Sequence, residues 1–234
     1  MDIYEIYAIG DQERIAISGI TLEVRDELLF MNPDRVQNPS SDARLRAAEK
    51  WPGLQVFAER GHDKRIKSYF QDAIGPGFSL HGCEIAVSEH ARQVLAPILG
   101  DQVRFLSLDV TGAPCKYWAF YATQYYYGEL DEELSVFAPP YSSAPDQRKK
   151  LRAPAFKPDN SLRDLYVFRL PGTMDYVVPD NTYATQNFFD LVKEHELGGF
   201  NFKRIHYKGF KANPADGISL VSTGPKYLAG WEGV

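Results

Sequence analysis

The chain has 234 residues, of which 44% are hydrophobic, 24% charged and 13% aromatic, and this globular composition excludes disorder along the whole chain. The formal net charge of -5 excludes a nucleic-acid-binding protein that relies on a broad basic surface. No stretch approaches the ~18 apolar residues of a membrane helix, and residues 1–5 do not resemble the start of a signal peptide. We therefore expect a soluble, cytoplasmic protein.

The N-terminal part of the chain predicts short strands followed by a helix. β-branched and aromatic residues are frequent at 3–9, 15–17 and 20–24, which favours strands. Residues 42–51 are rich in Ala, Arg, Leu and Glu, and either Ser41 or Asp42 suits the N-cap of a helix there. This segment predicts a short helix.

The middle of the chain predicts a strand, a helix and a second strand. Residues 84–87 and 103–110 have strand composition, and Ser88 is a good N-cap for the helix between them. Apolar residues at i, i+3, i+4 and i+7 predict one buried helix stripe, formed by Ala91, Val94, Leu95 and Ile98. Pro97 lacks a backbone donor, so we expect the helix to bend or end near it.

The same order of elements recurs later in the chain. Residues 165–170 and 176–178 predict strands, and residues 200–207 alternate like a half-buried strand. The helix between them has a predicted apolar stripe, formed by Phe188, Leu191, Val192 and His195. Gly198 and Gly199 predict a left-handed C-terminal cap. The recurrence is either an internal duplication or a common unit used twice.

These elements predict an α+β fold with mixed or antiparallel sheets, a few short helices and two strand-helix-strand units. Residues 138–154 are rich in Pro, Ser and basic residues, which indicates either a hinge or an ordered loop across the core. We expect residues 1–234 to form a single unit. The alternative is two lobes, 1–137 and 155–234, joined by this segment.

The side chains that could support catalysis or metal binding form no recognised pattern. Only His81 and Cys83 lie close in sequence, and nothing near them completes a tetrahedral metal site. Neither Cys83 nor Cys115 lies in a reactive-thiolate signature, so two reduced thiols are expected, although a cysteine could still meet a histidine in the fold. His195 is expected to be a packing residue on its helix. We expect no metal and no cofactor.

An acidic group and an aromatic stretch stand out next to each other. Glu129, Asp131, Glu132 and Glu133 are either the exposed start of a helix or a surface that contacts a partner protein, and they are the candidate partner-binding residues. Residues 117–127 are strongly aromatic. They lack interleaved basic residues, so a buried strand or strand pair is favoured over a stacking platform for single-stranded nucleic acid.

Three groups of segments occur in a fixed order. They are Ile85-Ala86-Val87-Ser88-Glu89-His90 with Val103-Arg104-Phe105-Leu106, then Tyr117-Trp118-Ala119-Phe120 with Leu130-Asp131-Glu132-Glu133-Leu134-Ser135, and last Phe168-Arg169-Leu170, Tyr176-Val177-Val178 and Leu197-Gly198-Gly199-Phe200-Asn201-Phe202. In this order they resemble the immunity-protein family numbered eleven of bacterial polymorphic toxin systems. The resemblance covers about residues 65–207, and Pro97 and the Pro-rich stretch after Ser135 depart from it.

The resemblance implies a non-catalytic protein that binds and neutralises a cognate toxin. The family motifs describe the fold and carry no catalytic residues to this chain. A basic toxin would suit the acidic group, and no nucleic-acid or membrane partner is expected. The oligomeric state is open. Two alternatives are a hydrolase-like enzyme whose site is assembled from distant residues and a regulatory module that binds another protein.

Overall fold

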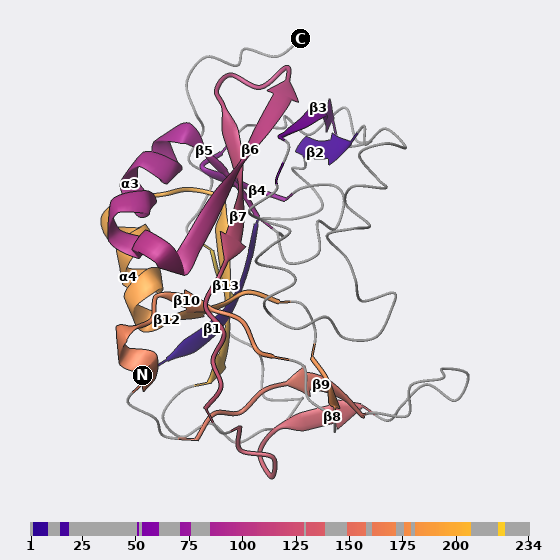
Figure 1. Ribbon diagram of the computed structural model, residues 1–234, viewed down its shortest axis with the longest axis vertical. Coiled ribbons are helices and arrows are strands. Elements are labelled where there is room, and N and C mark those ends of the chain that lie inside the picture. The colour runs from indigo at the N-terminus through magenta and orange to yellow at the C-terminus, as the bar shows by residue number, and fades with distance from the viewer. Residues whose placement is uncertain are drawn as a thin grey trace, which may run out of the picture.

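The computed structural model describes residues 2–8, 15–18, 51, 53–60, 71–75, 85–128, 130–138, 149–157, 161–171, 176–178, 181–206 and 220–222. These residues form three β-sheets and two α-helices (Figure 1). The predicted α+β class with few short helices is confirmed. The strand expected at 20–24 lies outside the described residues, and so does the helix expected at 42–51 apart from Trp51.

The first sheet brings the two ends of the chain together. Its strand order is β10 (Val167–Phe168), β12 (Tyr183–Thr185), β1 (Ile3–Ala8), β13 (Phe200–His206) and β14 (Leu220–Ser222), and every pairing is antiparallel. Strand β1 lies in the centre of this sheet, between two strands of the C-terminal part. The stretches 1–137 and 155–234 therefore share one hydrogen-bonded sheet.

The second sheet is mixed. Its order is β2 (Ile15–Ser18), β3 (Leu54–Arg60), β6 (Val103–Thr111), β7 (Tyr117–Ala122), β5 (Ala86–Ser88) and β4 (Ala73–Ile74). Strands β3 and β6 are parallel, whereas the other pairs are antiparallel. The aromatic stretch was predicted as a buried strand, and β7 confirms this for residues 117–122.

A small third sheet lies apart from the helices, at the lower right of Figure 1. Its order is β11 (Tyr176–Val177), β9 (Lys149–Ala153) and β8 (Val136–Ala138). Strand β9 pairs with β11 in parallel and with β8 antiparallel. Ala138 at the start of the Pro-rich segment 138–154 and residues 149–153 near its end are thus strand residues, and residues 139–148 lie outside the described part of the chain.

Helices α3 (Glu89–Leu99) and α4 (Gln186–Glu194) lie on the same side of the two larger sheets (Figure 1). A single buried cluster combines residues of both helices and both sheets. Within it, the ring of Phe120 on β7 lies 5.8 Å from the ring of Phe188 on α4. The two predicted strand-helix-strand units therefore share one apolar core. No helix in the described residues is long and apolar enough to cross a membrane.

The predicted helix stripes are partly right. Ala91 and Leu95 are buried on α3, but Ile98 is 38% exposed and Leu99 is buried in its place. The helix continues through Pro97 and ends at Leu99, where the 3-10 turn η2 (Gly100–Gln102) begins. On α4 the prediction fails at His195, which is exposed, because the helix ends at Glu194 and His195 is its C-cap.

The predicted glycine cap of α4 is also wrong. Glu196 is the residue with left-handed backbone, at φ 49°, and Leu197 N donates to Val192 O at 3.0 Å to close the helix end. Gly199 has φ +87° for another reason. A Cβ atom there would overlap the backbone carbonyl oxygen of Ala73, so Gly199 lets β13 approach β4.

Candidate partner-binding surface

The predicted acidic site lies in a turn and does not start a helix. Asp131, Glu132 and Glu133 belong to a single turn before β8, and Glu129 lies outside the described residues. Ser135 N donates to Asp131 O at 2.8 Å, and Leu134 N donates to the Asp131 carboxylate at 3.1 Å. The interpretation as a helix start is therefore wrong. Glu132 and Glu133 are exposed, and Asp131 is half-buried.

The structure ties this turn to a neighbouring segment at several points. Asp131 N donates to Ala155 O at 2.9 Å, and Ala155 N donates to Ser135 Oγ at 2.9 Å. Leu130 forms a β-bridge with Phe156. Ala155 is fully buried, so these hydrogen bonds hold the backbone of the turn against the core.

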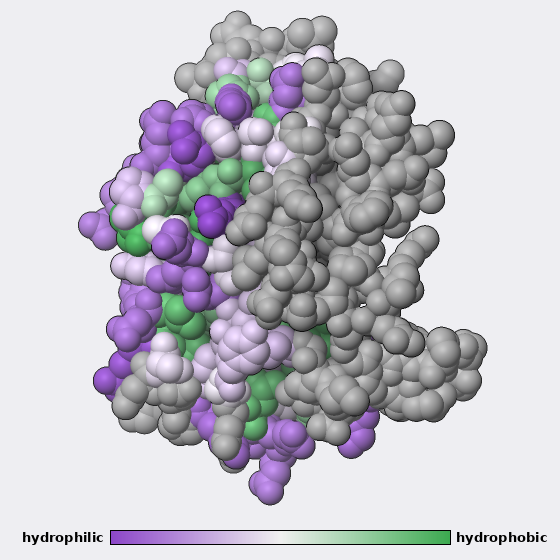
Figure 2. Space-filling view, viewed as in Figure 1, coloured by the Kyte–Doolittle hydropathy of each residue, from purple (hydrophilic) through white to green (hydrophobic). Residues whose placement is uncertain are grey.

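Two exposed hydrophobic residues flank the acidic side chains. Tyr127 is 70% exposed and Leu134 is 41% exposed, and Ile98 on α3 is the other large hydrophobic of this kind among the described residues. The neighbouring Tyr126 is buried, with its ring 5.7 Å from that of Phe156, and Leu130, which precedes the acidic turn, forms a β-bridge with the same Phe156. Both hydrophobic and hydrophilic side chains of the described residues are visible on the face of the molecule drawn in Figure 2.

Sequence reasoning missed Tyr127 and Leu134. The whole stretch 117–127 was expected to be buried, but β7 ends at Ala122 and the chain then leaves the sheet. A signal was available, because Gly128 follows Tyr127 and turn-forming residues mark the end of an apolar run. Leu134 lies between Glu133 and Ser135 and follows no periodic pattern.

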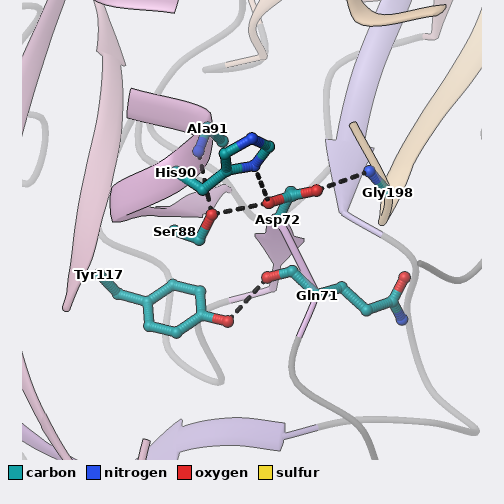
Figure 3. Close-up of polar contacts among 7 residues, drawn as sticks. All are labelled: Gln71, Asp72, Ser88, His90, Ala91, Tyr117 and Gly198. Atoms are coloured by element: carbon teal, nitrogen blue, oxygen red, sulfur yellow. Dashed lines mark hydrogen bonds and ion pairs between the residues drawn. The ribbon is translucent and has the colours of Figure 1, made fainter. Parts of the chain in front are cut away.

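The fold gathers another polar group around the buried carboxylate of Asp72 (Figure 3). Asp72 is fully buried and accepts hydrogen bonds from Ser88 Oγ at 2.8 Å, His90 Nδ1 at 3.1 Å and the backbone N–H of Gly198 at 3.1 Å. Ser88 also accepts a bond from Ala91 N at 3.1 Å, which confirms its predicted role as the α3 N-cap. The carboxylate thus connects the start of α3 to the loop after α4.

This group has the residue types of a serine hydrolase without the geometry. The Ser88 hydroxyl donates to Asp72 rather than to the imidazole, and it is fully buried. In a catalytic triad the histidine takes the serine proton and the carboxylate orients the histidine. His90 is half-exposed and bonds the same carboxylate oxygen as Ser88, so this arrangement orders a helix start.

Cys115 lies near the same helix start and has a free thiol. Burial raises the pKa of this thiol, against the opposing effect of hydrogen bonds with the Glu89 backbone and the Tyr117 side chain; the carboxylates of Asp72 and Glu89 add smaller effects that raise it. A nucleophilic cysteine needs a lowered pKa. Cys83 and His81 lie outside the described residues. Within the described ranges, no three His, Cys, Asp or Glu side chains are grouped so that they could hold a metal ion.

A second polar cluster lies on the surface of α3 and β7. Glu89 accepts hydrogen bonds from Arg92 Nη2 at 2.8 Å, from Trp118 Nε1 and from Gln93 Nε2 at 3.1 Å. The hydrogen bonds from Arg92 lower the pKa of the Glu89 carboxyl to about 2, against a smaller opposing effect of burial. The Arg92 guanidinium and the Lys116 ammonium lie 4.5 Å and 4.3 Å from the Trp118 ring centroid. Sequence reasoning did not single out this cluster.

Comparison with known proteins identified no relative of this chain. The chain matches no protein-family model, and no curated protein matches it either. The likeness to an immunity-protein family therefore stays a prediction from the segments quoted above.

Proposed function

We propose that this chain is an immunity protein that binds a cognate toxin in the cytoplasm and silences it without catalysing a reaction. The observation that carries the proposal is the exposure of the large hydrophobic side chains of Tyr127 and Leu134 close in sequence to carboxylates. The turn that contains Leu134 is hydrogen-bonded to the buried residue Ala155. Stable protein interfaces use such hydrophobic and aromatic anchors within a polar surround. Contact over about 800 Å² per partner would suffice for a specific complex.

The segments behind the family resemblance are consistent with this proposal. Residues 85–106 form β5, α3 and the first part of β6, and residues 168–202 run from β10 through α4 into β13. Both stretches contribute to the shared buried cluster. These two stretches belong to the scaffold, whereas the quoted segment Leu130–Ser135 contains the acidic turn; in binding proteins, loops at the edges of a scaffold commonly recognise the partner.

The polar groups of the described residues favour binding over hydrolysis. Ser88 and Asp72 are fully buried, and the Ser88 hydroxyl donates its hydrogen bond to the Asp72 carboxylate. The raised pKa of Cys115 disfavours the thiolate form of its side chain. The free thiol of Cys115 is compatible with a reducing compartment, which supports the cytoplasm as the place of action.

The test is complex formation with the protein encoded beside this chain's gene. Both proteins are purified and mixed in a calorimeter, and a toxin encoded at an unrelated locus serves as the control. We expect a one-to-one complex with a Kd of about 1 μM or tighter for the neighbouring protein and no heat for the control. Absence of binding to the neighbouring protein would remove the proposal's support.

A further inference from the structure

We infer that the toxin-contact surface consists of Tyr127, Asp131, Glu132, Glu133 and Leu134, and that it docks onto a cationic surface of the toxin. These five residues are called the 127–134 surface below. The inference rests on the proposed function and specifies where the partner binds and what chemistry it presents.

Tyr127 is the aromatic anchor of the 127–134 surface. It is 70% exposed, and its ring centroid lies 6.4 Å from that of Tyr125. Tyr125 is itself held in place, because it forms a β-bridge with Arg169, whose guanidinium lies 5.9 Å from the Tyr125 ring. Tyrosine offers a large, stiff contact area at a small cost in conformational entropy and is enriched among interface hot spots.

Leu134 adds a second exposed apolar side chain, and hydrogen bonds hold the backbone of its turn. Its backbone N–H is bonded to the Asp131 carboxylate, and the turn is held by the backbone of the buried residue Ala155. Binding does not have to order this turn first, which lowers the entropic cost of association. Ile98 is the third large hydrophobic exposed among the described residues, and it lies on α3 beside Pro97.

The charges select the partner. None of the three carboxylates of the 127–134 surface forms an ion pair with a residue that the structure describes. A partner with Lys or Arg side chains would compensate them, whereas an acidic partner would be repelled.

The inference is tested by calorimetry and binding kinetics with the purified protein encoded by the neighbouring gene as the probe. The variants are Tyr127→Ala, Leu134→Ala and the double variant Glu132→Lys/Glu133→Lys. Matched controls are Ile98→Ala for an exposed hydrophobic and Glu194→Lys for an exposed carboxylate on α4. All these side chains are exposed, and an unchanged circular dichroism spectrum and Tm check that each variant is folded.

We expect Tyr127→Ala to raise the Kd at least about tenfold and Leu134→Ala about fivefold. The double charge reversal should slow association at least about tenfold at low salt and remove its dependence on ionic strength. Both controls should stay within about twofold. A complex whose Kd does not change in any of the three surface variants overturns the inference and leaves the proposed function standing. No binding by the unchanged chain overturns both.

Discussion

The carboxylate of Asp72 accepts a hydrogen bond from the backbone N–H of Gly198, 126 positions later in the chain, at 3.1 Å. Gly198 is held at its carbonyl as well, because the backbone N–H of Ala73, the residue after Asp72, donates to Gly198 O at 2.9 Å. Asp72 also binds Ser88, the N-cap of α3. One buried side chain therefore connects the first strand-helix-strand unit to the second.

Replacing Asp72 with asparagine should destabilise the whole protein. The amide would keep one acceptor oxygen but would present N–H groups where Ser88 or Gly198 now donates, leaving buried donors without an acceptor. We expect the free energy of unfolding to fall by about 2–3 kcal/mol, measured by urea denaturation. The control is Asp109→Asn at an exposed position of β6, which should change stability by less than about 0.5 kcal/mol. Equal effects of the two substitutions would disprove the role assigned to Asp72.

Gly199→Ala should be far more harmful than Gly112→Ala. Both glycines have similar left-handed backbone, with φ +87° and +86°, so both substitutions carry the same strain of about 1–2 kcal/mol. At Gly199 the new Cβ would also overlap the Ala73 carbonyl oxygen, whereas no atom lies within 4 Å of a Cβ at Gly112. Crowding adds about 1–3 kcal/mol at Gly199 alone. Thermal denaturation of the two variants measures this difference, and matching Tm values would refute the close approach of β13 to β4.

The Glu89 cluster should contribute stability that depends on pH. The folded-state pKa of Glu89 is lowered from its ordinary value of 4.5 to about 2, chiefly by hydrogen bonds from Arg92. The contribution is therefore present above about pH 4.5 and is lost as pH falls from there to about 2. The group is close to the surface, so we expect only about 0.5 kcal/mol. Glu89→Gln should lower stability by this amount at pH 7, and the difference from the unchanged protein should shrink toward pH 2.5.

The fluorescence of Trp118 provides a second readout for this cluster. Its indole N–H donates to Glu89, so Glu89→Gln should alter the emission spectrum at pH 7. A stability difference that stays constant from pH 7 to pH 2.5 would rule out the lowered pKa of Glu89 as its source.

Cys115 should alkylate slowly in the folded protein. Burial raises the pKa of the thiol, so at pH 8 less thiolate is present than in the unfolded chain. We expect iodoacetamide to modify Cys115 several-fold more slowly under native conditions than in urea. Peptide mass spectrometry separates this cysteine from Cys83. Faster alkylation in the native state would instead point to an activated nucleophile and would favour the enzymatic alternative.

Local patterns predicted the scaffold well. Strands β1, β6 and β13 were expected within a residue or two of their bounds, and Ser88 was identified as a helix N-cap. These elements combine a local signal, such as β-branched composition or a capping side chain, with burial that agrees with it. Consistency between local preference and tertiary packing is what makes such predictions succeed.

The long-range contacts and the exposure of the candidate surface could not be predicted in this way. The Asp72 junction depends on residues separated by up to 126 positions, and no spacing rule relates them. Whether Leu99 or Ile98 is buried depends on how α3 is rotated about its axis against the sheet. The spacing of apolar residues along the sequence predicts that rotation only to within one residue. The exposure of Tyr127 depends on where β7 leaves the sheet, and a strongly aromatic stretch hides that boundary.

The most direct test of the account is a titration of the neighbouring gene product's toxic activity with this chain. A binding protein that is not an enzyme should reduce the activity linearly and abolish it at equal molar amounts, with no further loss over time. Tyr127→Ala should weaken this inhibition, while Ile98→Ala should not. Time-dependent loss of activity at a small fraction of the toxin concentration, or full activity at a molar excess of this chain, would contradict the account.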